Sequence, residues 1–292
     1  MKTFHFNNSS LQYLSCAKRY YYQVVKGLLP PPGGNKYTAA GLAFHKMMQL
    51  VGAAGFENIS FKVMLDKASL PPAIQKIPEL QQLTLAQAAD RIYQEHPELF
   101  QPDTLREHWF SYQLENDFGY LSSPNEGYVA APCGTMDNLS IINDTLVITD
   151  YKSTSKPIGP ELARSYKLTS QRFFYLMAAL AIDLPQPMAE LRDQLKLAWR
   201  YCYVHVETGS YHLEEPQLLN EAELSEFKRM ILDKAILAAA LHADPALAEK
   251  EGILTGQCWK CPFTQLCLAA DEQAAMDSWY YGSQPYNPKH DE

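Results

Sequence analysis

The chain has 292 residues, of which 47% are hydrophobic and 20% charged, and its formal net charge is −8 at pH 7. This length is enough for one large domain or for a core with an inserted lobe. No apolar run reaches the roughly 18 residues that cross a bilayer, and the polar N-terminus does not resemble a signal peptide. We therefore expect a cytoplasmic protein without a membrane partner. The negative charge argues against a protein that coats nucleic acid, but not against an enzyme with a local basic groove.

The first third of the chain is predicted to be helical. A helix capped by Ser9 or Ser10 is expected to run to about residue 25, and the run PPPGG at 30–34 ends it. A second helix is expected at about 38–53. Residues 55–105 are helical in pattern but are broken by Pro71, Pro72, Pro78 and Pro97, which predicts an inserted helical lobe.

The pattern then changes to short strands. Strands are predicted near 109–114 and at 129–137, 139–143 and 146–151, with Asn143-Asp144 as a hairpin turn. They are followed by a helix at 160–182, a strand at 196–207 paired with 211–213 across Gly209, and a helix at 221–241. This order predicts an α/β or α+β core, with a mixed central sheet flanked by helices.

Two acidic residues and a lysine lie at the ends of neighbouring predicted strands. Asp137 closes the run Gly-Thr-Met-Asp, and Asp150-Tyr151-Lys152 closes the next hairpin. Strand alternation puts the side chains of Asp150 and Lys152 on one face. An adjacent strand can bring Asp137 beside them.

Such a set forms a chemical unit. The carboxylates are hard oxygen ligands for Mg²⁺ or Mn²⁺, and the bound ion lowers the pKa of an attacking water. Lys152 can position or deprotonate that water and offset charge in the transition state. An isolated Asp-x-Lys is most often a surface salt bridge. Here the motif ends an apolar strand, and a second acid comes from the preceding strand.

Three further side chains are candidates for the same site. His45, on the second predicted helix, can supply a nitrogen ligand to the metal; alternatively it is a partly buried histidine bonded to backbone. Gln171 and Tyr175 are four residues apart on a predicted helix and share one face. They can orient Lys152 or contact a DNA phosphate, or they can belong to an ordinary amphipathic helix.

The six cysteines fall into two groups. Cys133 and Cys202 stand in apolar surroundings and are interpreted as core residues. Three others form C-x2-C-x5-C, a spacing that indicates metal binding in a cytosolic chain, and Cys16 is the best candidate for a fourth ligand. Zinc and a 4Fe–4S cluster both fit four cysteines, and three unrelated cysteines are the remaining alternative. The C-x2-C-x5-C cysteines are Cys258, Cys261 and Cys267.

Taken together, these motifs resemble the RecB-like nucleases of the PD-(D/E)XK superfamily. The resemblance is to the iron–sulfur branch that includes the CRISPR-associated RecB-type exonuclease and its non-CRISPR and phage relatives, and it spans roughly residues 9–267. The motifs occur in the family's order: Ser15-Cys16-Ala-Lys-Arg-Tyr20, Gly41-x-x-Phe-His45, Gly134-x-x-Asp137, Asp150-Tyr151-Lys152, Gln171-x-x-x-Tyr175 and C-x2-C-P-x4-C.

The resemblance implies a restriction-endonuclease-like core and specific roles. His45, Asp137, Asp150 and the Tyr151 carbonyl would hold Mg²⁺ or Mn²⁺, and Lys152 would be the catalytic lysine. Gln171 and Tyr175 would support the site and the DNA. The four motif cysteines would hold a 4Fe–4S cluster in preference to zinc, and would clamp the two ends of the chain together; these are Cys16, Cys258, Cys261 and Cys267.

Five regions are expected. They are the N-terminal helices with Cys16 and His45 (1–54), a helical insertion (55–105), the nuclease core (106–251), the C-terminal cysteine segment (252–281) and a flexible tail (282–292).

The implied activity is a metal-dependent DNA exonuclease acting on single strands or free ends in repair, recombination, or phage or CRISPR DNA processing. The alternative is a cluster-bearing DNA-binding or assembly subunit with little catalysis. Tyr20, Tyr21 and Tyr22 could stack on bases or belong to the core. Ala17 replaces a proline common in the family.

Overall fold

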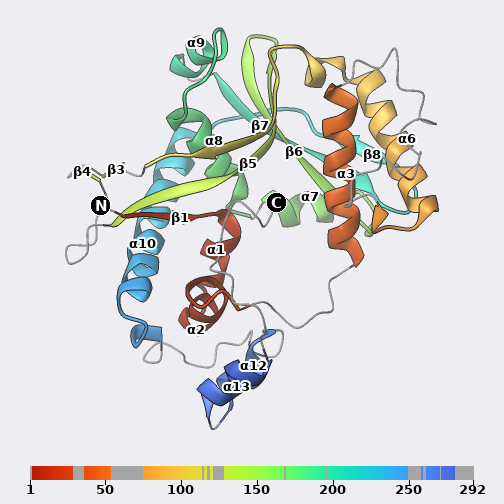
Figure 1. Ribbon diagram of the computed structural model, residues 1–292. Helices are drawn as coiled ribbons and strands as arrows, with labels where there is room; N and C mark the ends of the chain where they lie inside the picture. The colour runs from red at the N-terminus through yellow and green to blue at the C-terminus, as the bar shows by residue number, and fades with distance from the viewer. Residues whose placement is uncertain are drawn as a thin grey trace. The chain divides into compact units, whose positions relative to one another are not determined.

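The computed structural model divides the chain into two compact units (Figure 1). The first comprises residues 1–33, 111–134 and 222–292, and the second residues 34–110 and 135–221. Within the part of the chain that is described, no helix is long and apolar enough to cross a membrane. The predicted tail at 282–292 lies outside the described residues, as does 54–74 of the predicted insertion. The structure describes residues 2–28, 36–53, 75–113, 115–116, 119–120, 128–167, 169–194, 196–248, 258, 261–269 and 271–279.

A mixed sheet forms the centre of the second unit. Strand β5, whose second half belongs to this unit, runs antiparallel to β6, and β6 runs parallel to β7. Asn143 and Asp144 form the turn between β5 and β6 with φ of 47° and 57°, the left-handed conformation that tight hairpins use. Strands β8 and β9 pair with β7, and β2 pairs with β5. The strands are β2 (Leu105–Ser111), β5 (Tyr128–Ile142), β6 (Thr145–Thr154), β7 (Leu197–His205), β8 (Tyr211–Leu213) and β9 (Gln217–Leu218).

Helices cover both faces of this sheet. Tyr151, Cys202 and Val204 point to one face, where they share a core with α3 and α6. Trp199 points to the opposite face, as strand alternation requires, and its ring packs against Tyr175 of α8. The helices of this unit are α3 (Lys36–Ala53), α6 (Glu79–Glu95), the 3₁₀ helix η3 (Pro97–Phe100), α7 (Pro160–Lys167), α8 (Gln171–Ala181) and α9 (Met188–Asp193).

The first unit contains both ends of the described chain. Strand β1 (Lys2–Phe6), which the sequence did not predict, pairs in parallel with the first half of β5. Tyr20 packs its ring against His242 of α10, and their polar atoms lie 3.4 Å apart. The other elements are α1 (Asn8–Tyr13), α2 (Ala17–Tyr20), the π-helix η1 (Tyr21–Val25), β3 (Glu115–Asn116), β4 (Gly119–Tyr120), α10 (Glu221–Ala243), α12 (Thr264–Cys267) and α13 (Glu272–Trp279).

Three predicted elements have the wrong limits. The helix expected at 9–25 is broken because Cys16 is extended, with φ −144° and ψ 114°. The two strands expected at 129–143 are one, since Asn138 is buried and its side chain donates to the Leu99 carbonyl instead of forming a turn. The helix expected at 160–182 is two helices, and the Thr169 hydroxyl bonds the Tyr166 carbonyl at the break, a local bond that competes with helix continuation.

Candidate metal centre and cysteine segment

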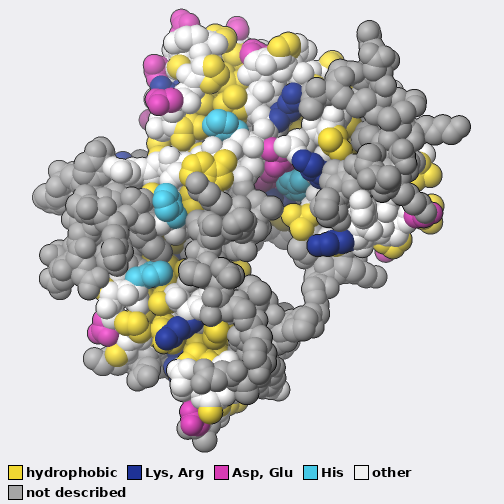
Figure 2. All heavy atoms as spheres, viewed as in Figure 1, with side chains coloured by type: hydrophobic (Ala, Val, Ile, Leu, Met, Phe, Trp, Pro, Cys, Tyr) yellow, Lys and Arg dark blue, Asp and Glu magenta, His cyan; other side chains and the backbone are white. Residues whose placement is uncertain are grey.

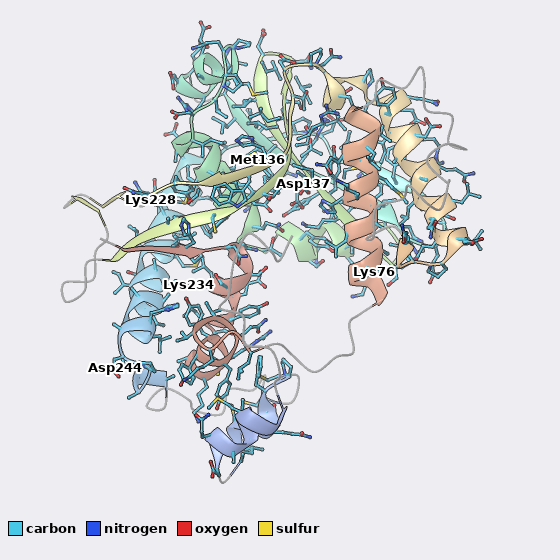
Figure 3. The ribbon with its side chains drawn as sticks, in the orientation of Figure 1. Lys76, Met136, Asp137, Lys228, Lys234 and Asp244 are labelled. Atoms are coloured by element: carbon cyan, nitrogen blue, oxygen red, sulfur yellow. The ribbon has the colours of Figure 1, made fainter. Side chains whose placement is uncertain are left out.

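Asp137 and Asp150 meet where two paired strands separate. The β5–β6 ladder ends at the pair Asn138 and Thr149, so the two aspartates are the next residue on each strand. Asp137 there accepts a hydrogen bond through Oδ2 from the backbone N–H of Tyr151, at 2.7 Å. Figure 3 shows Asp137 on β5, between the sheet and α3. The two neighbouring strands thus place the two aspartates at the same end of the ladder, and their role as metal ligands stays a prediction.

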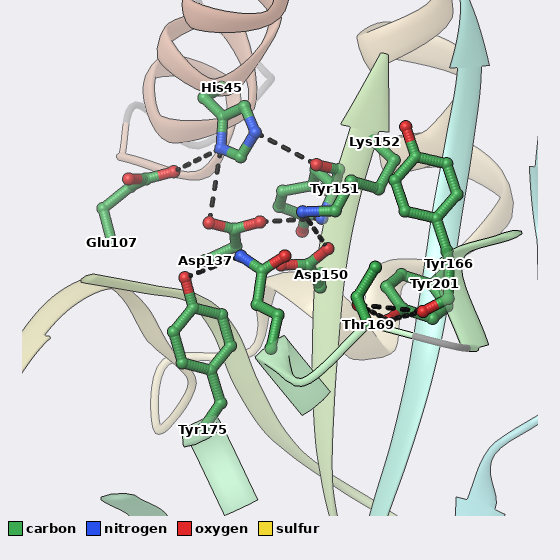
Figure 4. Close-up of polar contacts among 11 residues, drawn as sticks. His45, Glu107, Asp137, Asp150, Tyr151, Lys152, Tyr166, Thr169, Tyr175 and Tyr201 are labelled. Atoms are coloured by element: carbon green, nitrogen blue, oxygen red, sulfur yellow. Dashed lines mark hydrogen bonds and ion pairs between the residues drawn. The ribbon is translucent and has the colours of Figure 1, made fainter. Parts of the chain in front are cut away.

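His45 reaches the same place from α3. Its Nδ1 lies 3.3 Å from Asp137 Oδ1, and its Nε2 lies 3.0 Å from the carbonyl oxygen of Tyr151 (Figure 4). A Cβ at Gly41, one helical turn earlier, would lie 2.9 Å from Ser153 Oγ on β6. The glycine of the Gly41-x-x-Phe-His45 motif therefore lets the helix approach the strand closely enough for the histidine to reach the acids.

Glu107 is a site residue that the sequence did not reveal. Its Oε1 lies 3.5 Å from His45 Nδ1. Among the described residues, the only three metal-ligating side chains whose ligand atoms all lie within 4.8 Å of one another are His45, Glu107 and Asp137. Glu107 has φ 46° within strand β2, a left-handed conformation that is costly for this residue and is often found at functional sites. No short motif in β2 marks this glutamate in advance.

Asp150 and Lys152 form a buried ion pair. The side chain of Asp150 is 1% exposed, and the Lys152 Nζ lies 2.5 Å from its Oδ2. Neither Asp150 oxygen accepts a well-directed hydrogen bond from the described part of the chain, and the same holds for Glu107 Oε1. The Lys152 ammonium offsets the charge of Asp150, but the spare lone pairs of these buried carboxylate oxygens favour a further cation. The donor set therefore fits a divalent ion such as Mg²⁺ or Mn²⁺, which prefers oxygen ligands.

The charges of these groups depend on one another. Burial raises the pKa of Asp150 to about 6, although the Lys152 ammonium opposes the shift. Burial lowers the pKa of His45, but the carboxylates of Asp137 and Glu107 outweigh it and raise that pKa well above its usual value. Burial also opposes the charge on Lys152, but Asp150 and Asp137 raise its pKa. Without a metal, His45 and Lys152 thus both carry positive charge that balances the acids.

Gln171 and Tyr175 share one face of α8, as predicted. The Gln171 amide donates a hydrogen bond to the Tyr175 hydroxyl at 3.1 Å. Figure 4 shows the Tyr175 side chain pointing from α8 toward Asp137. Tyr175 therefore faces the acidic cluster, and Gln171 is hydrogen-bonded to it.

On the other side of the site, Lys152 lies beside an aromatic group. Its Nζ is 6.0 Å from the centre of the Tyr166 ring. That ring packs against Tyr201 and Tyr203 of β7. The catalytic-lysine candidate is thus flanked by a carboxylate and by aromatic side chains.

The cysteine segment packs against the N-terminal π-helix. Phe263 lies 5.7 Å from Tyr22, ring centre to ring centre. Burial raises the pKa of Cys267, and a hydrogen bond from Tyr22 lowers it. Cys261 and Cys16 lie close enough to Cys267 to raise the same pKa. Cys261 and Cys267 both pack against the apolar cluster that contains Tyr22 and Phe263, and Cys16 lies within electrostatic range of Cys267.

Cys258 belongs to the same turn. Its carbonyl oxygen accepts a hydrogen bond from the backbone N–H of Cys261, at 3.1 Å, and another from the Thr264 hydroxyl. Cys133 and Cys202 are fully buried, which confirms that they are core residues. Tyr20 and Tyr22 are also fully buried, so they belong to the core in this structure.

A family model and a solved structure are similar to this chain. A family model described as "PD-(D/E)XK nuclease superfamily" matches residues 8–268. A solved structure, "Crystal structure of SSO0001", aligns with 12% identity and a TM-score of 0.38, covering 90% of this chain and 85% of that chain. None of the curated proteins matches.

Proposed function

The chain belongs to the PD-(D/E)XK nuclease superfamily, and on that premise we propose that it is a divalent-metal-dependent DNA exonuclease acting on single strands or free ends. Membership by itself implies a metal-dependent phosphodiesterase with a DNA substrate. The observation that carries the proposal is the contact of His45 with Asp137 where the β5–β6 ladder ends, next to the buried ion pair of Asp150 and Lys152. A surface salt bridge after a strand would have neither this burial nor this histidine.

Each residue of the site has a separate role in the proposed reaction. His45, Asp137, Asp150 and the Tyr151 carbonyl would hold the cation, and Glu107 lies within reach as a further oxygen ligand. When bound, the cation would polarise a phosphate oxygen and lower the pKa of the attacking water. The raised pKa of Lys152 favours a protonated lysine, which orients that water through hydrogen bonds and offsets negative charge. Gln171 and Tyr175 would support this arrangement from α8.

The preference for free ends rests on the resemblance to RecB-like exonucleases. End-labelled and circular DNA, single- and double-stranded, should be incubated with Mn²⁺ and the wild-type chain. We expect linear single strands to be degraded progressively and covalently closed circles to survive. Cutting of circles would show an endonuclease, and the absence of any cleavage would favour a DNA-binding or assembly subunit. Linear single strands blocked at one end or the other then give the polarity of degradation.

We further propose that Cys16, Cys258, Cys261 and Cys267 hold a 4Fe–4S cluster with a structural role. The packing of Cys261 and Cys267 against the cluster that contains Tyr22 and Phe263 supports this, and Cys16 lies within electrostatic range of Cys267. Thiolates are the usual ligands of such clusters. Since phosphodiester hydrolysis needs no redox step, the cluster would stabilise the fold by closing a loop of nearly the whole chain. Stoichiometric zinc after anaerobic purification would identify zinc as the occupant instead.

A further inference from the structure

Trp109 stands out among the surface residues of the second unit. Several large hydrophobic side chains are exposed in the described part of the chain, and Trp109, at 37%, is the one aromatic residue among them. Of the three stacking candidates in the sequence, Tyr20 and Tyr22 are fully buried and Tyr21 is half-buried. An exposed tryptophan offers a large flat surface to a nucleobase.

Its position on β2 places it on the side of the metal site. The next residue, Phe110, points toward α8, with ring centres 6.0 Å from Phe174 and 5.8 Å from Tyr175. Adjacent strand side chains point to opposite faces. Trp109 therefore points to the opposite face of β2, the side from which α3 brings His45.

Trp109 is also close to the acids along the strand. A strand rises about 3.3 Å per residue, so the Cα atoms of Trp109 and Glu107 lie about 7 Å apart. Glu107 is itself in contact with His45. Figure 2 shows acidic and histidine side chains adjoining Lys and Arg side chains on the viewed face, with hydrophobic side chains next to them. A base stacked on Trp109 would thus belong to a nucleotide next to the metal site.

We propose that Trp109 is a substrate-binding residue on which an unpaired nucleobase stacks beside the metal centre. The inference rests on the proposed nuclease function, and it narrows the substrate of the nuclease to a DNA strand with an unpaired base at Trp109. A duplex keeps its bases stacked on one another and cannot offer a face to the indole without unpairing. Single strands bind such platforms with little sequence preference, because every base has a π-face.

The test is a binding titration without divalent cation, so that no hydrolysis intervenes. A labelled oligothymidylate of about 15 nucleotides is titrated with the full chain, and Kd is read by fluorescence anisotropy. The variants are Trp109→Ala, Trp109→Phe and, as the control, Leu218→Ala, which removes an exposed side chain of β9. We expect Trp109→Ala to raise Kd about 5- to 150-fold, Trp109→Phe to keep most of the affinity, and Leu218→Ala to have no effect.

Tryptophan emission gives a second readout. Unlabelled oligothymidylate should quench the wild-type emission, and this quenching should disappear in Trp109→Phe although that variant still binds. An unchanged Kd in Trp109→Ala, full quenching in Trp109→Phe, or an equal loss of affinity for a blunt duplex would overturn the inference. Cleavage with Mn²⁺ is scored separately. If the wild type binds as expected but cleaves no DNA, the proposed nuclease function fails and the stacking role stands.

Discussion

Asp137 and Tyr151 are joined across two separating strands by the hydrogen bond from the Tyr151 N–H to Asp137 Oδ2. The carbonyl of the same tyrosine faces His45 Nε2, and Asp137 Oδ1 faces His45 Nδ1. One strand residue thus fixes the orientation of the carboxylate with its N–H and presents its own oxygen to the site. The backbone of β6 is therefore part of the candidate metal centre.

Replacing Lys152 with Ala should lower the rate of DNA cleavage by at least about 100-fold, because a charged donor to the transition state is lost. The measurement is the initial rate on an end-labelled single strand with saturating Mn²⁺. Lys156→Ala, which removes an exposed lysine just after the end of β6, is the control and should keep the wild-type rate. Asp150→Ala should be as inactive as Lys152→Ala. A wild-type rate in either would remove that residue from catalysis.

The Lys152→Ala variant should also have a distinctive stability profile. The variant leaves Asp150 buried without its ion-pair partner, so its folded-state pKa rises further above the value in the unfolded chain. A folded state that holds an extra proton loses stability as pH increases through that range. In thermal unfolding, the Tm of the variant should therefore lie further below the wild-type Tm at pH 8 than at pH 5.

Metal affinity should fall as pH is lowered. The pKa of Asp150 is about 6 and that of His45 is well above its usual range, and a ligand must lose its proton before it binds metal. Near pH 7 metal binding displaces the His45 proton, so the apparent Kd for Mn²⁺ should rise about tenfold for each unit by which the pH is lowered. Below about pH 6 it should rise more steeply, since Asp150 is then also protonated. Calorimetric titrations in buffers of different ionisation enthalpy would measure the released protons, and a pH-independent Kd would contradict the ligand set.

Much of this site could be predicted from the sequence, because strand alternation and the hairpin turn at Asn143-Asp144 place Asp150 and Lys152 together. Glu107 could not be predicted in this way. It reaches His45 through a left-handed residue within a strand, and no local pattern announces that conformation. The helix break at Cys16 could not be predicted either, since the helical periodicity of the sequence continues through this residue. The five-region division and the cytoplasmic location stay predictions.

Glu107→Gln should weaken Mn²⁺ binding by at least about tenfold, because a neutral amide replaces an oxygen ligand that is poised beside His45 and Asp137. The isosteric change leaves the strand backbone as it is. Glu161→Gln, an exposed position on α7, provides the matched control. The readout is the Mn²⁺ dissociation constant by calorimetry, with the metal-induced rise in Tm as a second measure. Equal affinities for the two variants would exclude Glu107 as a ligand.

Alanine at Cys261 or Cys267 should remove the iron and lower Tm, since either change breaks the proposed cluster. Iron and sulfide are quantified after anaerobic purification and compared with Cys202→Ala, which removes a thiol from the core of the other unit. We expect the core variant to keep its full iron content. A wild-type preparation without iron, or ligand variants with the wild-type iron content, would contradict the cluster assignment.

The most direct test of the central claim is a crystal structure of the chain with Mn²⁺, with the ion located by its anomalous scattering. We expect a peak bonded to His45, Asp137, Asp150 and the Tyr151 carbonyl, with oxygen ligands at about 2.0–2.6 Å. Displacement of the His45 Nε2 contact to the Tyr151 carbonyl should accompany binding. A fully occupied ion elsewhere on the chain, with His45 still bridging Asp137 and Tyr151, would contradict the assignment of this cluster as the metal centre.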